Sequence, residues 1–184
     1  MRLYFATSNR HKLEEARRVL AQFSIDIEIA PVKKLEIQAD DVVEISRAAA
    51  ERLCAAYNYI VVEDDGLYIE ALRGFPGPYS EYVYRTLGLS GVLKLLEGAG
   101  DRSAYFKSAV SLCIDGLVKT FVGIAKGRIA EAPRGSAGFG FDPIFIPEGF
   151  DETFAEMGVE AKSKISHRAK AFQALGEWIA GVRK

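Results

Sequence analysis

Hydrophobic residues near the start of the chain change their spacing after residue 6, from a continuous run to a helical repeat. Residues 3–6 form a short apolar run, which is typical of a buried strand. Three small polar residues follow at 7–9, and apolar side chains then recur at helical spacing from Leu13 to Phe23. The pattern predicts a strand, a short polar turn and an amphipathic helix.

The next stretch repeats this alternation of strand and helix. Isoleucines at every second position over residues 25–29 predict a strand with one solvated face. A helix is expected from Asp41 to about Tyr57, and the apolar run 59–62 predicts a buried strand. Three consecutive acids follow at 63–65, and we expect the strand to end there.

The residue pattern in the second half of the chain predicts two short helices, a long hairpin, a short strand and a final helix. These elements are expected over residues 80–87, 91–97, 103–114, 117–129, 144–146 and 166–182. Ser90 would cap the second helix. Asp115-Gly116 is a turn pair that favours a tight hairpin. A glycine-rich loop over residues 133–143 separates the hairpin from the short strand.

Early strands alternate with helices and a long hairpin comes later, which predicts an α/β fold with a mixed sheet. The 184 residues, of which 49% are hydrophobic, are enough to bury one sizeable core. We therefore expect a single domain over residues 1–184.

The balance of charges argues against an anionic polymer or surface as a partner. The chain has 24 basic and 25 acidic residues, a formal net charge of −1. Binding to nucleic acid or to anionic membranes usually leaves a basic excess. No stretch approaches the ~20 apolar residues of a membrane span. We expect neither a nucleic-acid polymer nor a membrane among the partners.

Cys54 and Cys113 lie far apart, each in an apolar segment. Their spacing fits neither a disulfide framework nor a metal site, so we expect two buried thiols in a reducing compartment. A strand-like N-terminus without an apolar signal region agrees with a cytoplasmic location. The chain has only two Asn and three Gln, and this depletion of thermolabile residues suits a thermophile.

Thr7, Ser8 and Asn9 lie where the first strand would meet a helix N-terminus. The first N–H groups of a helix have no partner within it, and the helix dipole favours an anion there. Lys12, one turn later, would add an ammonium aimed at the same ligand. In the alternative, Ser8 or Asn9 only caps the helix and Lys12 is solvated.

Glu63, Asp64 and Asp65 form a second candidate site, because ligands of open α/β sheets bind beyond the carboxyl ends of strands. Three adjacent carboxylates repel one another unless a cation or a water-filled cleft relieves the repulsion. Glu36, in the preceding loop, would supply a further oxygen ligand. Mg²⁺ held by one or two carboxylates and substrate phosphates is usual in nucleotide chemistry. An exposed acidic turn is the alternative.

Ser166-His167-Arg168 begins the last predicted helix, and Lys162 and Lys164 precede it. Basic groups at a helix N-terminus oppose the helix dipole, so their placement makes more sense if they face a ligand. In the alternative, His167 is a polar residue at a solvated helix end, and the two lysines lie in a solvated loop.

Phe139-Gly140-Phe141-Asp142 lies within the glycine-rich loop. An aromatic ring beside glycine can lie flat against a nucleotide base. Phenylalanines at strand spacing can also belong to the core, and we expect this for one of the two.

Seven short motifs occur together in one order along the chain. They are Thr7-Ser8-Asn9-x-x-Lys12, Glu63-Asp64-Asp65-Gly66-Leu67, Gly74-x-Pro76-Gly77-Pro78-Tyr79, Ser103-Ala104-Tyr105, Ala132-Pro133-Arg134-Gly135, Phe139-Gly140-Phe141-Asp142 and Ser166-His167-Arg168. In this order the chain resembles the inosine triphosphate pyrophosphatase family, also called Ham1-like or XTP/dITP diphosphatases. The resemblance runs from residue 3 to beyond residue 168.

The resemblance implies a homodimeric, Mg²⁺-dependent enzyme with an elongated mixed-sheet fold and a central cleft between two lobes. It would hydrolyse ITP, dITP and XTP to the monophosphate and pyrophosphate, and so cleanse the nucleotide pool. Glu36 and Asp64 would ligate the metal, and Asp64 and Lys12 would be the catalytic residues. The substrate-binding positions would be Thr7, Ser8, Asn9, Arg10, His11, Lys12, Asp65, Phe139, Gly140, Phe141, Asp142, Lys162, His167 and Arg168.

Two positions depart from the pattern of the family. Many relatives have Ser or Thr where this chain has Asp65, so both a metal role and a phosphate contact stay open there. The helix that starts near Asp41 commonly carries a Lys that would align with Ala49. Either Arg47 or Arg52 replaces it, or the contact is missing.

Two other functions remain as alternatives. One is a Maf-like pyrophosphatase that acts on other altered or canonical nucleotides, and the other is a nucleotide-binding sensor without turnover. The joint presence of Lys12, Glu36 and Asp64 argues against the sensor, because binding alone needs no base beside a metal.

Overall fold

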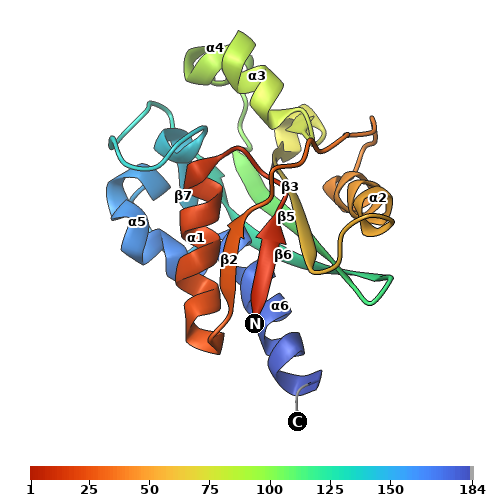
Figure 1. The fold of residues 1–184 in the computed structure, drawn as a ribbon. Coiled ribbons are helices and arrows are strands. Elements are labelled where there is room, and N and C mark those ends of the chain that lie inside the picture. Colours follow the sequence, from red (N-terminus) through yellow and green to blue (C-terminus); the bar gives the residue numbers. More distant parts are fainter. Residues whose placement is uncertain (183–184) are drawn as a thin grey trace.

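A mixed sheet of seven strands runs through the molecule, and helices pack on both of its faces (Figure 1). The computed structural model describes residues 1–182. Its strands are β1 (Arg2–Phe5), β2 (Asp26–Ile29), β3 (Ile60–Ile69), β4 (Pro76–Gly77), β5 (Ser103–Ile114), β6 (Leu117–Ile129) and β7 (Phe145–Pro147). The order in the sheet is β2-β1-β3-β5-β6-β7, and β4 pairs with β3 outside this path. The predicted α/β fold with a mixed sheet is confirmed, and the division into two lobes stays a prediction.

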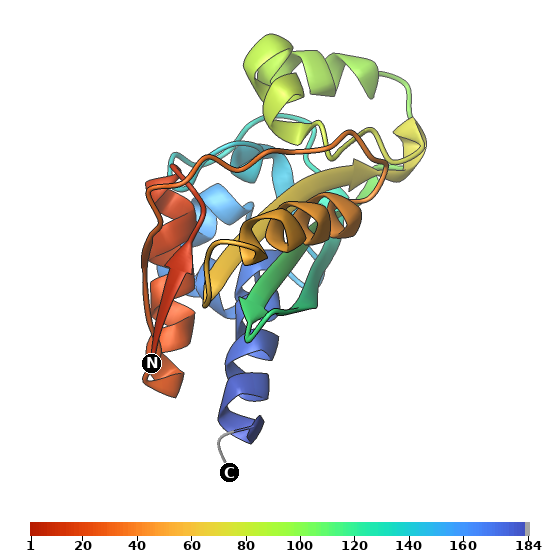
Figure 2. The same cartoon turned by 45° about the vertical axis from the view of Figure 1, so that its right-hand side comes forward.

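The helices are joined to the sheet by loops of different lengths and by three 3₁₀ turns. They are α1 (Arg10–Leu20), α2 (Val42–Cys54), α3 (Ser80–Thr86), α4 (Gly88–Leu95), α5 (Phe154–Ile165) and α6 (His167–Val182), and the 3₁₀ turns are η1 (Ala21–Phe23), η2 (Glu70–Leu72) and η3 (Asp142–Ile144). In Figure 2, α2 lies in front of the sheet, whereas α1 and α6 lie at its side and behind it.

Alternate residues of β3 serve the two faces of the sheet, as expected for a strand covered on both sides. Val61 packs into a core with Leu13 of α1 and Phe172 of α6. Its neighbours Ile60 and Val62 pack in a separate core that includes alanines of α2. A third core joins α3, α4 and α5 to the other end of the long strands.

The first predicted strand, turn and helix are confirmed as β1, a polar turn and α1. β1 pairs in parallel with β2 on one side and with β3 on the other. The predicted hairpin is also confirmed, since β5 and β6 pair along their whole length. Asp115 and Gly116 both have positive φ, at 50° and 78°, as a tight two-residue hairpin turn requires.

The prediction that a strand ends at the three acids is wrong. β3 continues through them to Ile69, and each acid pairs with a residue of β5. The strand tolerates the charges of Glu63 and Asp65 because Lys12 of α1 and Arg168 of α6 neutralise them. The acids therefore lie in the middle of a strand and not beyond its carboxyl end.

The helices differ from the sequence prediction in three respects: two boundaries lie elsewhere, and one helix was not predicted. α2 ends at Cys54 and not near Tyr57. α4 begins at Gly88, so Ser90 lies inside this helix and does not cap it. α5 was not predicted, because Gly158 interrupts it with a φ of 74° and so breaks the helical pattern.

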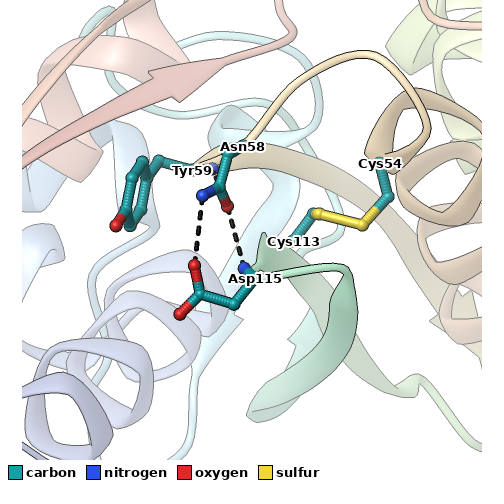
Figure 3. The surroundings of a disulfide bond; sticks show 5 residues. All are labelled: Cys54, Asn58, Tyr59, Cys113 and Asp115. Atoms are coloured by element: carbon teal, nitrogen blue, oxygen red, sulfur yellow. Dashed lines mark hydrogen bonds between the residues drawn. A yellow bond between two sulfur atoms is a disulfide. The ribbon is translucent and has the colours of Figure 1, made fainter.

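The prediction of two buried thiols is also wrong, because Cys54 and Cys113 form a disulfide (Figure 3). α2 packs across β3 and β5 and brings the two Cα atoms to 5.5 Å. Close by, the side chain of Asn58 donates to Asp115 Oδ1 and accepts from the backbone N–H of Asp115. Both contacts link the segment after α2 to the end of β5. A separation of 59 residues hides this proximity from sequence spacing.

None of the helices described over residues 1–182 has the length and apolar character to cross a membrane.

Candidate active site

A cleft of about 1250 Å³ opens beside the middle of β3 and collects nearly all of the predicted site residues. The predicted residues that line it are Thr7, Ser8, Asn9, Lys12, Glu36, Asp64, Asp65, Phe139, Gly140, Phe141, Asp142, Lys162, His167 and Arg168. Arg10 and His11 lie outside this lining, and both are exposed. One cleft therefore receives residues from α1, β3, the glycine-rich loop, α5 and α6.

Asn9 caps α1 at the edge of the cleft. Its side-chain oxygen accepts from the backbone N–H groups of His11 and Lys12, at 3.0 and 3.3 Å. Thr7 Oγ1 in turn accepts from the N–H of Asn9 at 3.1 Å. The capping alternative is thus correct for Asn9, which already occupies two N–H groups that an anion would use.

The three acids of β3 point alternately to two sides, as strand geometry requires. Glu63 and Asp65 share one side, where Lys12 and Arg168 each contact both of them. Asp64 points to the other side, where its nearest cation is Lys34. The three acids therefore contribute to two separate groups of charges within the one cleft.

Arg168 is almost fully buried, and its guanidinium faces carboxylates from two elements. It donates to Glu63 Oε1 and Glu15 Oε2, both at 2.9 Å, and its Nη2 lies 3.0 Å from Asp65 Oδ2. Burial alone would raise the pKa of Asp65, but Lys12 and Arg168 outweigh it and hold that pKa well below its usual range. Both Lys12 and Arg168 have raised pKa values: burial opposes their charge, and the carboxylates outweigh it.

Lys162 is a second buried cation, and it bridges two acids. Its Nζ donates to Glu15 Oε1 at 3.0 Å and to Asp142 Oδ2 at 2.7 Å. Glu15 therefore joins Lys162 to Arg168. Sequence reasoning missed Glu15, although an acid three residues after Lys12 on the apolar face of a predicted helix was a signal for it. Lys164, by contrast, is exposed.

His167 begins α6 between the cleft and the core. Its ring stacks on Phe106 with centroids 4.6 Å apart, and Nε2 lies 3.4 Å from Asp65 Oδ2. Burial lowers the pKa of His167 more than Asp65 raises it, so the imidazole is neutral at pH 7. Ser166 caps the helix by accepting from the N–H of Ala169. His167 thus positions Asp65 without adding charge.

The sequence left open which of Phe139 and Phe141 belongs to the core and which faces the cleft. Phe141 is buried in the core under α3 and α4. Phe139 lines the cleft, where the exposed His11 ring stacks on it at 5.3 Å and Lys162 Nζ lies 4.8 Å from its centroid. Asp142 holds this loop by accepting from the N–H of Phe139 at 2.9 Å. The expectation that one of the two belongs to the core is confirmed.

Asp64 and Glu36 approach each other around the ammonium of Lys34. Nζ of Lys34 lies 2.7 Å from Glu36 Oε1 and 3.5 Å from Asp64 Oδ1. Burial raises the pKa of Asp64 to about 7, despite the opposing effect of Lys34. Its Oδ2 is buried and has no hydrogen-bond partner within residues 1–182. Sequence reasoning missed Lys34.

These oxygens fit a hard divalent cation, although the described residues include no cluster of three or more His, Cys, Asp or Glu side chains suited to a metal. Mg²⁺ needs only one or two protein carboxylates when substrate phosphates supply the rest. The unpartnered oxygen of Asp64, with Glu36 beside it, is such a donor set.

The position aligned with the family lysine holds no cation. Ala49 is 2% exposed and packs in the core beneath α2. Arg47 bonds Glu51 on the exposed surface of the helix, and Arg52 is exposed as well. Neither arginine is among the residues that line the cleft.

Comparison with known proteins places this chain among close relatives. The model of the Ham1 family matches residues 3–178. A dITP/XTP pyrophosphatase of Pyrobaculum aerophilum is 61% identical over 97% of this chain and 96% of its own length. A dITP/XTP pyrophosphatase of Saccharolobus solfataricus is 49% identical over 94% of this chain and 91% of its own length.

Solved structures agree with the sequence matches. A HAM1 protein from Coxiella burnetii superposes with a TM-score of 0.82 at 30% identity, over 98% of this chain and 99% of that chain. The Ham1 protein of Staphylococcus aureus gives a TM-score of 0.81 at 27% identity, over 99% of this chain and 100% of that chain. Sequence and structure together assign the chain to the Ham1 family.

Proposed function

We propose that the chain hydrolyses the non-canonical purine nucleoside triphosphates dITP, XTP and ITP to the monophosphate and pyrophosphate. Relatives at 61% and 49% identity carry the name dITP/XTP pyrophosphatase. Within the molecule, the observation that carries the proposal is Asp64, a buried carboxylate with a pKa of about 7 and an unpartnered oxygen in the cleft. The activity would remove deaminated purines from the nucleotide pool.

Asp64 acts in this proposal as the general base that takes a proton from the attacking water. A base with a pKa near 7 is well matched to proton transfer at neutral pH. Lys12, at the N-terminal turn of α1, holds the terminal phosphates so that pyrophosphate leaves as one unit. The carboxylates of Glu63 and Asp65 keep Lys12 protonated for this task.

Glu36 and Asp64 are the residues that would hold Mg²⁺, with phosphate oxygens of the substrate completing its ligands. The bound ion would neutralise negative charge on the triphosphate. Asp65 has both oxygens engaged by Lys12, Arg168 and His167, so we assign it to the positioning of these side chains and not to the metal.

The ring of Phe139 is the proposed platform for the purine base. His11 is exposed and covers this ring by stacking alone, so a base can replace it there. Hypoxanthine and xanthine carry a 6-oxo acceptor, whereas adenine carries a 6-amino donor. Donors at that position, from Arg168 and the backbone near Phe139, would leave a donor facing a donor with ATP. Each such mismatch costs about 1–3 kcal/mol.

A homodimer in the cytoplasm is the proposed state of the enzyme, on the basis of its resemblance to the family. Large apolar side chains are exposed on and around α3 and α4, and they include Tyr79, Tyr82, Tyr84, Leu87 and Leu95. Apolar exposure of this kind is frequent where a second subunit packs. Light scattering on the purified protein would give the mass of a dimer, and a monomer mass would contradict the proposal.

Turnover of a nucleotide panel tests the proposed function. We expect kcat/KM for XTP, dITP and ITP to exceed that for ATP by about 100-fold and to lie well above that for GTP, and EDTA to abolish the activity. Activity on canonical or otherwise altered nucleotides with none on XTP would favour the Maf-like alternative. Tight binding of XTP without hydrolysis in Mg²⁺ would favour the sensor.

A further inference from the structure

Lys34 lies in the loop between β2 and α2, and oxygen atoms surround its ammonium. This loop crosses the molecule from the edge of the sheet to α2 (Figure 2). Besides its contacts with Glu36 at 2.7 Å and Asp64 at 3.5 Å, Nζ donates to the backbone carbonyl of Glu63 at 2.9 Å. The side chain is only 16% exposed, which is unusual for a lysine in a loop.

The carboxylates around Lys34 are the ones that the proposed function assigns to Mg²⁺, so the role of Lys34 rests on that function. Mg²⁺ lies roughly 2 Å from its oxygen ligands. An ammonium 2.7 Å from Glu36 Oε1 occupies the same space, and two cations repel each other. Lys34 therefore has to leave before a divalent cation can bind to Glu36 and Asp64.

A single ammonium does not satisfy this set of oxygens. Asp64 is 9% exposed, and its Oδ2 lacks a hydrogen-bond partner in the described part of the chain. Two carboxylates against one lysine also leave a net negative charge when both are ionised. A buried oxygen without a hydrogen-bond partner costs free energy. A divalent cation that contacts this oxygen would therefore stabilise the two carboxylates more than the single ammonium does.

The ammonium of Lys34 could also contact the phosphate oxygens of a substrate in the cleft. Its side chain lines the same cleft as Lys12. A lysine has a flexible four-carbon stem and three donors, so its ammonium can turn from carboxylates to phosphate oxygens. A triphosphate in the cleft would offer such oxygens, and the loop need not unfold for this movement.

We propose that Lys34 is a placeholder cation and a substrate-positioning residue. Its ammonium occupies the metal position between Glu36 and Asp64 in the substrate-free protein, and it transfers to the phosphates when the divalent cation enters. It follows that the substrate-free protein binds the metal weakly, and that metal and nucleotide favour each other's binding.

Metal binding without turnover tests this role. Mn²⁺ is titrated into the substrate-free protein as a substitute for Mg²⁺, and the free ion is counted by its EPR signal. We expect Lys34→Met to bind Mn²⁺ at least tenfold more tightly than the wild type. Lys34→Gln, which keeps a donor for the carbonyl of Glu63, should show the same gain. The control is Lys33→Met, which removes the neighbouring exposed charge in the same loop. Lys33 also lines the cleft, but Lys34 is the residue that contacts Glu36 and Asp64, so this variant should stay within twofold of the wild type.

Calorimetry with tripolyphosphate in saturating Mn²⁺ tests the transfer to phosphate, because in this proposal the ammonium leaves Glu36 and Asp64 only when the cation is bound. Lys34→Met should weaken this binding at least fivefold while it strengthens Mn²⁺ binding. Unchanged Mn²⁺ affinity, or an equal gain in Lys33→Met, would overturn the placeholder role. A gain for Mn²⁺ without a loss for tripolyphosphate would overturn the transfer. Failure of the wild type to hydrolyse XTP would refute the proposed function alone, since neither titration depends on turnover.

Discussion

Glu15→Gln removes one negative charge from the buried network while it keeps the size of the side chain. Glu15 accepts from Lys162 and from Arg168, and it is only 6% exposed. Burial alone would raise its pKa, but Arg168 and Lys162 outweigh burial and lower the pKa from 4.5 to about 2. At about 1.4 kcal/mol per pH unit, the ionised carboxylate contributes about 3 kcal/mol to folding at pH 7.

The pH dependence separates this charge effect from a loss of packing. A lowered carboxylate pKa stabilises the protein above pH 4.5, and this stabilisation is lost as the pH falls toward 2. The difference between wild type and variant should therefore shrink to about 1.4 kcal/mol at pH 3. For a chain of this length, 3 kcal/mol corresponds to roughly 6–12 °C in Tm at pH 7.

Differential scanning calorimetry at pH 7 and pH 3 measures both values. Glu14→Gln is the matched control, since Glu14 is the exposed neighbour in α1, and it should change the free energy of unfolding by less than about 0.5 kcal/mol. An equal deficit of Glu15→Gln at both pH values would refute the charge argument. A Tm equal to that of the wild type at pH 7 would refute the coupling of Glu15 to Lys162 and Arg168.

Three further substitutions test other parts of the account. Asp64→Asn should lower kcat for XTP by at least about 100-fold with the fold intact, and turnover near the wild-type rate would remove Asp64 as the base. Phe139→Leu should raise KM for XTP roughly tenfold with a smaller change in kcat, because base stacking contributes about 1–3 kcal/mol; equal KM values would place the base elsewhere. Cys54→Ser should lower the free energy of unfolding by about 4 kcal/mol, because the unfolded chain regains the entropy that the cross-link across 59 residues removes, as calorimetry under non-reducing conditions would measure.

Local sequence patterns predicted helices and strands well where particular residue types determine the backbone conformation. Asp115-Gly116 fixed the hairpin, because both positions need positive φ. The helical repeat after Asn9 fixed α1, and Asn9 caps it. α5 was missed because Gly158 breaks the local repeat, although the packing of Phe154 in the core holds the helix in place.

Motifs in the sequence included most of the predicted residues that line the cleft, but they did not predict how these residues pair. Adjacent acids in a sequence suggest one cluster, whereas a strand directs Asp64 to one side and its neighbours Glu63 and Asp65 to the other. Glu15 and Lys34 belong to no motif, and they enter the site because α1 packs against α5 and α6 and because the loop after β2 approaches β3. Contacts between distant segments decide the charges in this cleft.

The disulfide was unpredictable for the same reason, since it depends on how α2 crosses β5. The prediction of a reducing compartment rested on two free thiols, and the disulfide leaves neither thiol free. Disulfides do occur inside cells in hyperthermophiles. A low content of Asn and Gln points in the same direction.

Hydrolysis of XTP in water labelled with ¹⁸O, followed by phosphorus NMR, tests the central claim most directly. In the proposed mechanism, water activated by Asp64 attacks the α-phosphorus while Lys12 holds the leaving phosphates. We predict xanthosine monophosphate and pyrophosphate as the first products, with the label in the monophosphate. Xanthosine diphosphate with labelled orthophosphate, or label in the pyrophosphate, would contradict the assigned geometry.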